Sequence, residues 1–179
     1  MADIGVGVGW SSIGIALAYP NALVDGFDLD PYSVELATAN AADFDVADRV
    51  CFQCRDAGDP ALAGDYDFAL AVECIHDMAD PVAALAAMRR LVGPGGTVLI
   101  VDENAAETFQ PDGNASERLL YGYSILHCLP VSMADQPSAA TGALMRPGTF
   151  QRYAESAGFT SVEILPVENE AFYFYRLTA

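Results

Sequence analysis

The start of the chain carries residues suited to holding a nucleotide-type ligand. An aspartate, Asp3, is followed by glycines at alternate positions, Gly5, Gly7 and Gly9. Because glycine has no side chain, such a loop lets a bound molecule lie against bare backbone between a strand and a helix. The dinucleotide pattern Gly-x-Gly-x-x-Gly requires a glycine at position 10, where Trp10 stands instead. The loop therefore favours a nucleotide-type ligand other than a nicotinamide dinucleotide.

His76 is the residue best suited to moving a proton. It follows an apolar run, in the stretch Glu73-Cys74-Ile75-His76-Asp77. A neutral imidazole, whose ordinary pKa is about 6.5, can accept the proton of a hydroxyl group and make its oxygen a better nucleophile. His76 is therefore a candidate general base. The alternative is a histidine that only hydrogen-bonds its own loop.

Apolar runs and turn residues predict alternating strands and helices after the glycine loop. We expect helices over 10–19, 31–42 and 80–91, and strands over 23–27, 50–53, 68–72 and 97–101. This alternation indicates a mostly parallel α/β sheet with helices on both faces. Two further strands, 162–165 and 172–177, flank a short polar turn and predict an antiparallel hairpin at the sheet edge.

Length and charge narrow the class of partner. The 179 residues suit one domain, and 25 acidic residues against 8 basic ones give a net charge of -17, which repels nucleic acid. No apolar run reaches the roughly 20 residues that a membrane span needs, so we expect a cytoplasmic protein with no membrane partner.

Cys51 and Cys54 have C-x-x-C spacing without a second such pair. This favours ordinary core thiols over a metal site.

These features resemble the class I S-adenosylmethionine-dependent methyltransferases, a family with a three-layer Rossmann-like sandwich. The Asp3 loop is similar to the family motif Asp-x-Gly-x-Gly-x-Gly, and the terminal hairpin is similar to its last two strands. The resemblance implies S-adenosylmethionine as cofactor, held by residues that follow the strands. These are Asp3, Gly5, Gly7 and Gly9 in the loop, Asp28 for the ribose hydroxyls, Leu29 and Ala57 at the adenine, Asp56 for its amino group, and Glu73 beside the methionine part. From the residues alone, Asp28 as a turn or helix cap and Asp56 as a solvated turn remain alternatives.

A small-molecule acceptor is implied by two further segments. His76-Asp77-x-x-Asp80 is similar to a segment of small-molecule O-methyltransferases in which the histidine is the general base, with Met78 in place of the usual aromatic residue. Residues 104–147 stand where such enzymes build a substrate cover, and a helix from about 116 carries apolar and aromatic side chains there. We expect Tyr121 and His127 to contact the substrate, the alternative being core packing. No aspartate-rich metal cluster is evident, and no metal is expected.

The first strand departs from the family pattern. Only Met1 and Ala2 precede Asp3, and each missing buried strand residue costs roughly 1.5 to 3 kcal/mol. We therefore expect either a fragment that lacks an N-terminal domain or a second copy that covers the shortened strand. The same feature leaves open a non-catalytic, methyltransferase-like module with a regulatory or assembly role. A NAD-dependent oxidoreductase is a further alternative, which Trp10 and the hairpin oppose.

Overall fold

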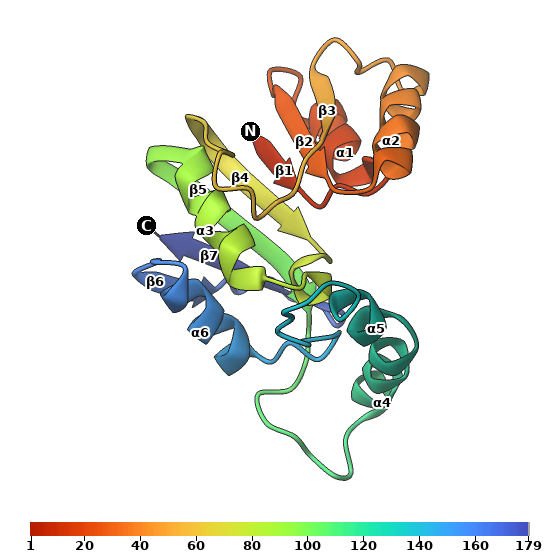
Figure 1. The fold of residues 1–179 in the computed structure, drawn as a ribbon, viewed down its shortest axis with the longest axis vertical. Helices are drawn as coiled ribbons and strands as arrows, with labels where there is room; N and C mark the ends of the chain where they lie inside the picture. Colours follow the sequence, from red (N-terminus) through yellow and green to blue (C-terminus); the bar gives the residue numbers. More distant parts are fainter. Residues whose placement is uncertain (179) are drawn as a thin grey trace.

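The computed structural model describes residues 1–178, whose centre is a seven-stranded sheet (Figure 1). The strands lie in the order β3-β2-β1-β4-β5-β7-β6. All neighbours from β3 to β5 pair in parallel, whereas β7 runs antiparallel to both β5 and β6. The bounds are β1 Ala2–Ile4, β2 Val24–Asp28, β3 Val50–Cys54, β4 Tyr66–Val72, β5 Val92–Glu103, β6 Ser161–Ile164 and β7 Phe172–Thr178. This confirms the predicted Rossmann-like sandwich with a C-terminal antiparallel hairpin.

Helices pack on both faces of this sheet. Side chains alternate along a strand, so Ala2 and Ile4 face one side of β1 and Asp3 faces the other. Ala2 and Ile4 belong to the core beneath α3 (Pro81–Leu91) and α6 (Pro147–Ser156), whereas Asp3 meets the first turn of α1. Figure 1 shows α1 and α2 beside β1 to β3, and α3 and α6 over β4, β5 and β7. The remaining bounds on this side are α1 Trp10–Ala18 and α2 Pro31–Asp43.

Two of the helices begin where the sequence supplies a cap. The carboxylate of Asp30 accepts a hydrogen bond from the N–H of Ser33, and that of Asp80 accepts one from the N–H of Ala83. A proline follows each aspartate at the first helical position, where its missing N–H costs nothing. These caps fix where the chain leaves β2 and the short helix η1, Ile75–Asp77, and so fix the loops that carry the site residues.

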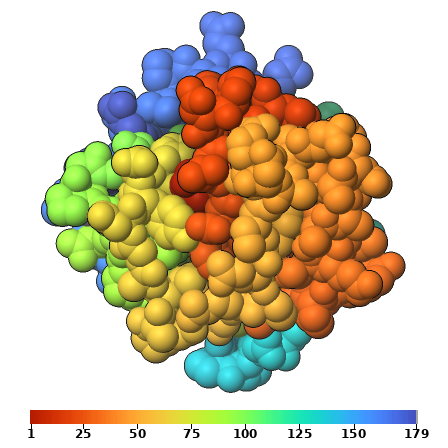
Figure 2. All heavy atoms as spheres, turned by 90° about the horizontal axis from the view of Figure 1, so that it is seen from above, coloured from red at the N-terminus to blue at the C-terminus, as the bar shows by residue number. Residues whose placement is uncertain are grey.

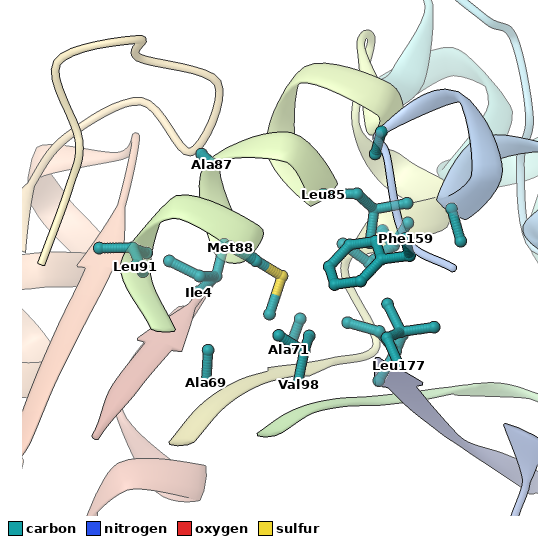
Figure 3. Close-up of a cluster of buried hydrophobic side chains, with 14 of the residues drawn as sticks. Ile4, Ala69, Ala71, Leu85, Ala87, Met88, Leu91, Val98, Phe159 and Leu177 are labelled. Carbon is teal, nitrogen blue, oxygen red and sulfur yellow. The ribbon is translucent and has the colours of Figure 1, made fainter. Parts of the chain in front are cut away.

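The larger core holds β1 and β4 in place beneath α3 (Figure 3). Leu85, Met88 and Leu91 of α3 are completely buried, and the figure shows Met88 above Ile4, Ala71 and neighbouring strand residues. Burying each large apolar side chain contributes roughly 1.5 to 3 kcal/mol. The rigid packing matters for function because the carboxyl ends of β1 and β4 carry candidate site residues.

β1 is short but lies at the centre of the sheet. Each of its three residues is at most 1% exposed. They pair with residues 25–27 of β2 on one side and with residues 69–71 of β4 on the other. Seen from above, the red start of the chain lies between the orange segments that follow it and the yellow residues of β4 (Figure 2). The predicted short first strand is therefore a paired and buried one.

β5 begins earlier than predicted. Tyr66 pairs with Val92 and Phe68 pairs with Thr97, so Asp67 alone stands opposite residues 93–96. This is a bulge in which Gly95 adopts a φ of 85°. Residues 92–96, which lie between the predicted helix and the predicted strand, belong to β5 because the bulge absorbs the extra residues.

The cysteines differ in burial. Cys128 is buried, but the prediction of core thiols is wrong for Cys51 and Cys54, which are both exposed. The reason is their place on β3, the outermost strand of the parallel part of the sheet.

Within the cover region, residues 104–147, one continuous helical segment lies beyond the ends of β4 and β5 (Figure 1). It consists of α4 Ala115–Tyr123, the π-helical turn η2 Ser124–Cys128 and α5 Leu129–Ser132. Asn114 caps it by accepting a hydrogen bond from the N–H of Glu117, one to two residues before the predicted start. Among residues 1–178 there is no helix both long and apolar enough to cross a membrane.

Candidate functional site

Glycines shape the loop between β1 and α1. Gly5, Gly7 and Gly9 have φ angles of 66°, 52° and 88°, a left-handed conformation that other residues adopt only at a cost. A Cβ added to Gly7 would meet no atom within 4 Å, whereas one added to Gly5 would lie 2.7 Å from Sγ of Cys74. The loop therefore offers open backbone to a ligand at Gly7, and it packs directly on the segment that follows β4.

Asp3 lies beneath the loop with 1% of its surface exposed. Its Oδ2 accepts hydrogen bonds of 2.7 Å from the hydroxyls of Ser11 and Ser12. Its Oδ1 is buried and finds no hydrogen-bond partner within residues 1–178. Burial raises the pKa of Asp3 to about 6, although the two serine hydroxyls lower it. An unpaired buried oxygen is costly, and an ammonium group, such as that of the methionine part of S-adenosylmethionine, has the chemistry to satisfy it.

Asp28 ends β2 and joins two loops. Its Oδ2 accepts a hydrogen bond of 2.7 Å from the N–H of Gly7, and its Oδ1 accepts one of 2.9 Å from the N–H of Asp30. The capping role weighed for Asp28 belongs instead to Asp30. Each oxygen of Asp28 keeps a second lone pair, so the carboxylate remains able to accept hydrogen bonds from two neighbouring hydroxyls, as a ribose presents.

The expected adenine contacts follow β2 and β3. The N–H of Arg55 donates to the carbonyl of Asp28 at 2.8 Å, which ties the two loops together. Leu29 is 61% exposed, and Ala57 is half-buried against the larger core. Asp56 is exposed, and its Oδ1 accepts a hydrogen bond of 2.8 Å from the N–H of Gly58. That bond is the turn weighed as the alternative for Asp56, and its adenine role stays a prediction.

His76 lies in the short helix η1, Ile75–Asp77, directly after β4, and only 3% of it is exposed. Its Nδ1 is 2.7 Å from Oδ1 of Asp102, and its Nε2 is 3.3 Å from Oδ1 of Asp77. Burial alone would lower the pKa of His76, but the hydrogen bond with Asp102 and the charges of Asp102, Asp77 and Glu73 raise it to about 9. The imidazole is thus oriented by one carboxylate and is protonated at neutral pH.

Carboxyl groups crowd around His76. Glu73 turns the chain at the end of β4 with a φ of 55°. Burial, and after it the charges of Glu103 and Asp102, raise the pKa of Glu73 to about 8, and burial also raises that of Glu103. Burial and the neighbouring negative charges therefore favour the protonated form of Glu73 at neutral pH. The sequence reasoning missed Asp102 and Glu103, although their place at the end of an apolar strand was a usable signal.

Tyr121 and His127 both lie in the cover, in different surroundings. The hydroxyl of Tyr121 accepts a hydrogen bond of 3.1 Å from the guanidinium of Arg146, which also forms a 2.6 Å ion pair with the buried Glu117. His127 is exposed. The contacts of Arg146 with Tyr121 and Glu117 hold α4 against the start of α6. The substrate roles of Tyr121 and His127 stay predictions.

The cover meets the segment that carries His76. The N–H of Gly142 donates to the carbonyl of His76 at 3.1 Å, and the N–H of Ala139 donates to that of Ala79 at 2.9 Å. Cys128 of η2 brings its Sγ within 4.8 Å of a ring nitrogen of His76. Sequence reasoning did not single out Cys128, because a regular helical period gives no sign of a π turn.

Comparisons with known proteins bear on the family and the fold of the chain. A family profile described as "Methyltransferase domain" matches residues 1–96. The "Ubiquinone biosynthesis O-methyltransferase" of Thiobacillus denitrificans is 28% identical over 97% of this chain and 71% of its own. The "Probable tocopherol O-methyltransferase, chloroplastic" of Oryza sativa subsp. japonica is 31% identical over 63% of this chain. The solved structure "PigF with SAH" superposes with a TM-score of 0.74 at 19% identity over 99% of this chain.

The chain spans 33% of the rice protein and 50% of the PigF chain. The family profile covers the glycine loop, Asp28 and His76, and the strand order carries the inserted β7. This excludes the nicotinamide-dependent oxidoreductase as the family of the chain. The chain belongs to the class I S-adenosylmethionine-dependent methyltransferases.

Proposed function

We propose that the chain transfers a methyl group from S-adenosylmethionine to a hydroxyl oxygen of a small molecule. The observation that carries the proposal is the buried His76, aligned by Asp102 in a segment that packs on the glycine loop through Cys74. The names of the relatives, both O-methyltransferases, support an oxygen acceptor. The net charge of -17 supports a small molecule over a nucleic acid.

The cofactor residues proposed from the sequence suit this reaction. Gly7 offers bare backbone, Asp28 offers two acceptor oxygens, and the unpaired Oδ1 of Asp3 offers a partner to an ammonium. Leu29 and Ala57 would flank the adenine, and Glu73 lies at the end of β4 near Cys74. When bound, S-adenosylmethionine supplies a methyl carbon on a sulfonium sulfur.

His76 has the role of general base in this proposal. Bound S-adenosylmethionine would supply the methyl group to the acceptor oxygen, and its sulfur would keep the electron pair of the broken carbon–sulfur bond. The hydroxyl proton of the acceptor would move to Nε2 of His76. Asp102 holds Nδ1, so Nε2 is the nitrogen left to accept the proton. Because the pKa of His76 is about 9, the base is available in the neutral form mainly at alkaline pH.

The cover region would close over the acceptor. Tyr121 and His127 are the proposed acceptor contacts, and a Tyr121→Phe variant should raise KM with little change in kcat. The cytoplasmic location and a second copy over β1 also stay predictions.

Calorimetry tests the proposal. Titration with S-adenosylmethionine and with its demethylated product, S-adenosylhomocysteine, should show binding, and titration with NAD should show none. An assay of methyl transfer to a panel of phenols and alcohols then tests the acceptor class. Binding without any turnover would favour the non-catalytic module, and binding of neither compound would refute the proposal.

A further inference from the structure

Three side chains of metal-binding type meet under the cover. Ligand atoms of His76, Asp77 and Cys128 all lie within 4.8 Å of one another. His76 is 3% exposed, Cys128 is 7% exposed, and the side chain of Asp77 is 24% exposed. Two of them belong to η1 and the third to η2, 51 positions further along the chain. The fold, rather than a sequence motif, brings them together.

Asp77 supplies the observation that points to a cation. Its Oδ1 is shielded from solvent and accepts no hydrogen bond from any residue that the structure describes. It lies 3.3 Å from Nε2 of His76, within ion-pair distance, but the two groups are not aligned as a hydrogen bond. A buried carboxylate oxygen without a donor is uncommon and costly, and a metal ion would satisfy it.

His76 is held as metal-binding histidines are held. Histidine ligands commonly use their other ring nitrogen to bond a carboxylate, which fixes the ring and its tautomer. Here Nδ1 lies 2.7 Å from Oδ1 of Asp102, and Asp102 is 1% exposed. Nε2 is therefore the nitrogen that faces Asp77. On the other side, the π turn of η2 presents Cys128, and such turns recur at functional positions.

We propose that His76, Asp77 and Cys128 bind a zinc ion. One imidazole nitrogen, one carboxylate oxygen and one thiolate sulfur form a ligand set that zinc accepts in tetrahedral geometry, and thiolate disfavours magnesium and calcium. Three protein ligands leave a fourth position for water. The thiolate and the carboxylate balance the two charges of the ion.

Zinc at this site would block methyl transfer. The metal occupies Nε2 of His76, the atom that accepts the proton in the proposed reaction, so the same nitrogen serves as base only in the metal-free protein. This consequence rests on the proposed function. The binding of zinc itself does not.

Binding is tested on the full chain after removal of metal. Zinc affinity is measured by competition with a chromophoric chelator, and cobalt(II) is added as a spectroscopic probe. We expect one zinc ion per chain and a thiolate-to-cobalt charge-transfer band. A Cys128→Ser variant should lose that band and bind zinc more weakly by at least the roughly 10- to 100-fold that loss of a residue supporting a ligand costs.

The exposed pair Cys51 and Cys54 provides the matched control, because its C-x-x-C spacing could bind metal independently. A Cys51→Ser, Cys54→Ser double variant should keep the zinc site and the band. The inference is overturned if that double variant loses zinc while Cys128→Ser retains it, or if the wild type binds no zinc. Asp77→Asn, which leaves every thiol in place, gives the same test if Cys128→Ser does not fold.

Activity separates this inference from the proposed function. In the assay, zinc should inhibit the wild type, whereas the rate of Cys128→Ser should be the same with and without zinc. Zinc binding in a protein that does not bind S-adenosylhomocysteine would overturn the proposed function alone. Turnover without zinc binding would overturn the metal site alone.

Discussion

Replacing Asp3 by asparagine should stabilise the protein at high pH and weaken its hold on the cofactor. The pKa of Asp3 is raised from 3.8 to about 6 in the folded chain, chiefly by burial. A carboxyl group with a raised pKa favours the folded state when protonated, so its contribution is largest at low pH and is lost as pH rises through about 6. The full shift of about 2 units corresponds to about 3 kcal/mol.

Part of this loss lies in a range where denaturation is easily measured. Between pH 5 and pH 8, a shift from 3.8 to about 6 removes about 1.4 kcal/mol from the free energy of unfolding. Asparagine has nearly the same shape and no titration. In urea denaturation, the free energy of unfolding of Asp3→Asn should therefore fall by about 1.4 kcal/mol less between pH 5 and pH 8 than that of the wild type.

The same substitution removes the charge proposed to meet the ammonium of the cofactor. Hydrogen bonds to charged groups contribute about 1.5 to 3 kcal/mol, so calorimetry should show S-adenosylhomocysteine binding weakened roughly 10- to 100-fold. Asp43→Asn, which changes an exposed carboxylate at the end of α2, is the control and should alter neither measurement. Equal pH dependence in Asp3→Asn and the wild type would show that burial does not hold this proton.

Three further predictions test other parts of the site. In metal-free protein, kcat/KM should rise about tenfold per pH unit up to about pH 9, and His76→Gln should abolish that rise and lower kcat by roughly 10²- to 10⁴-fold. A plateau beginning near pH 7 contradicts the raised pKa of His76, and a rise that persists in His76→Gln contradicts the base assignment. Gly7→Ala should lower the free energy of unfolding by about 1 kcal/mol because residue 7 has a φ of 52°. Gly14→Ala should raise it by about that amount because residue 14 lies within α1, where alanine is the better helix former. Urea denaturation measures both changes. Arg146→Met should destabilise by about 3 kcal/mol because it leaves the buried Glu117 unpaired, and adding Glu117→Gln should recover part of the loss in thermal unfolding.

The order of helices and strands could be predicted from the sequence because each element depends on a local rule. Apolar runs gave the buried strands, Asp30 and Asp80 were followed by proline at helix starts, and the glycine spacing marked the loop after β1. These signals depend on neighbours within a few residues. They can therefore be recognised without knowledge of the tertiary structure.

What the sequence did not reveal depends on contacts between distant segments. The pairing of His76 with Asp102 joins the ends of two strands. The approach of Cys128 to His76 depends on a π turn, which the periodicity of apolar residues does not predict. The bulge at 93–96 likewise exists only because β4 runs alongside. Side-chain partners and burial, which set the pKa of His76, follow from those contacts alone.

The two backbone hydrogen bonds from Gly142 and Ala139 to the carbonyls of His76 and Ala79 have a mechanical consequence. Any swing of residues 115–142 that admits an acceptor must either break these bonds or pull on the loop beside β4. The position of the cover and the position of the segment that carries His76 are therefore coupled. An enzyme built this way would link the access of the acceptor to the placement of its proton acceptor through one segment of the chain.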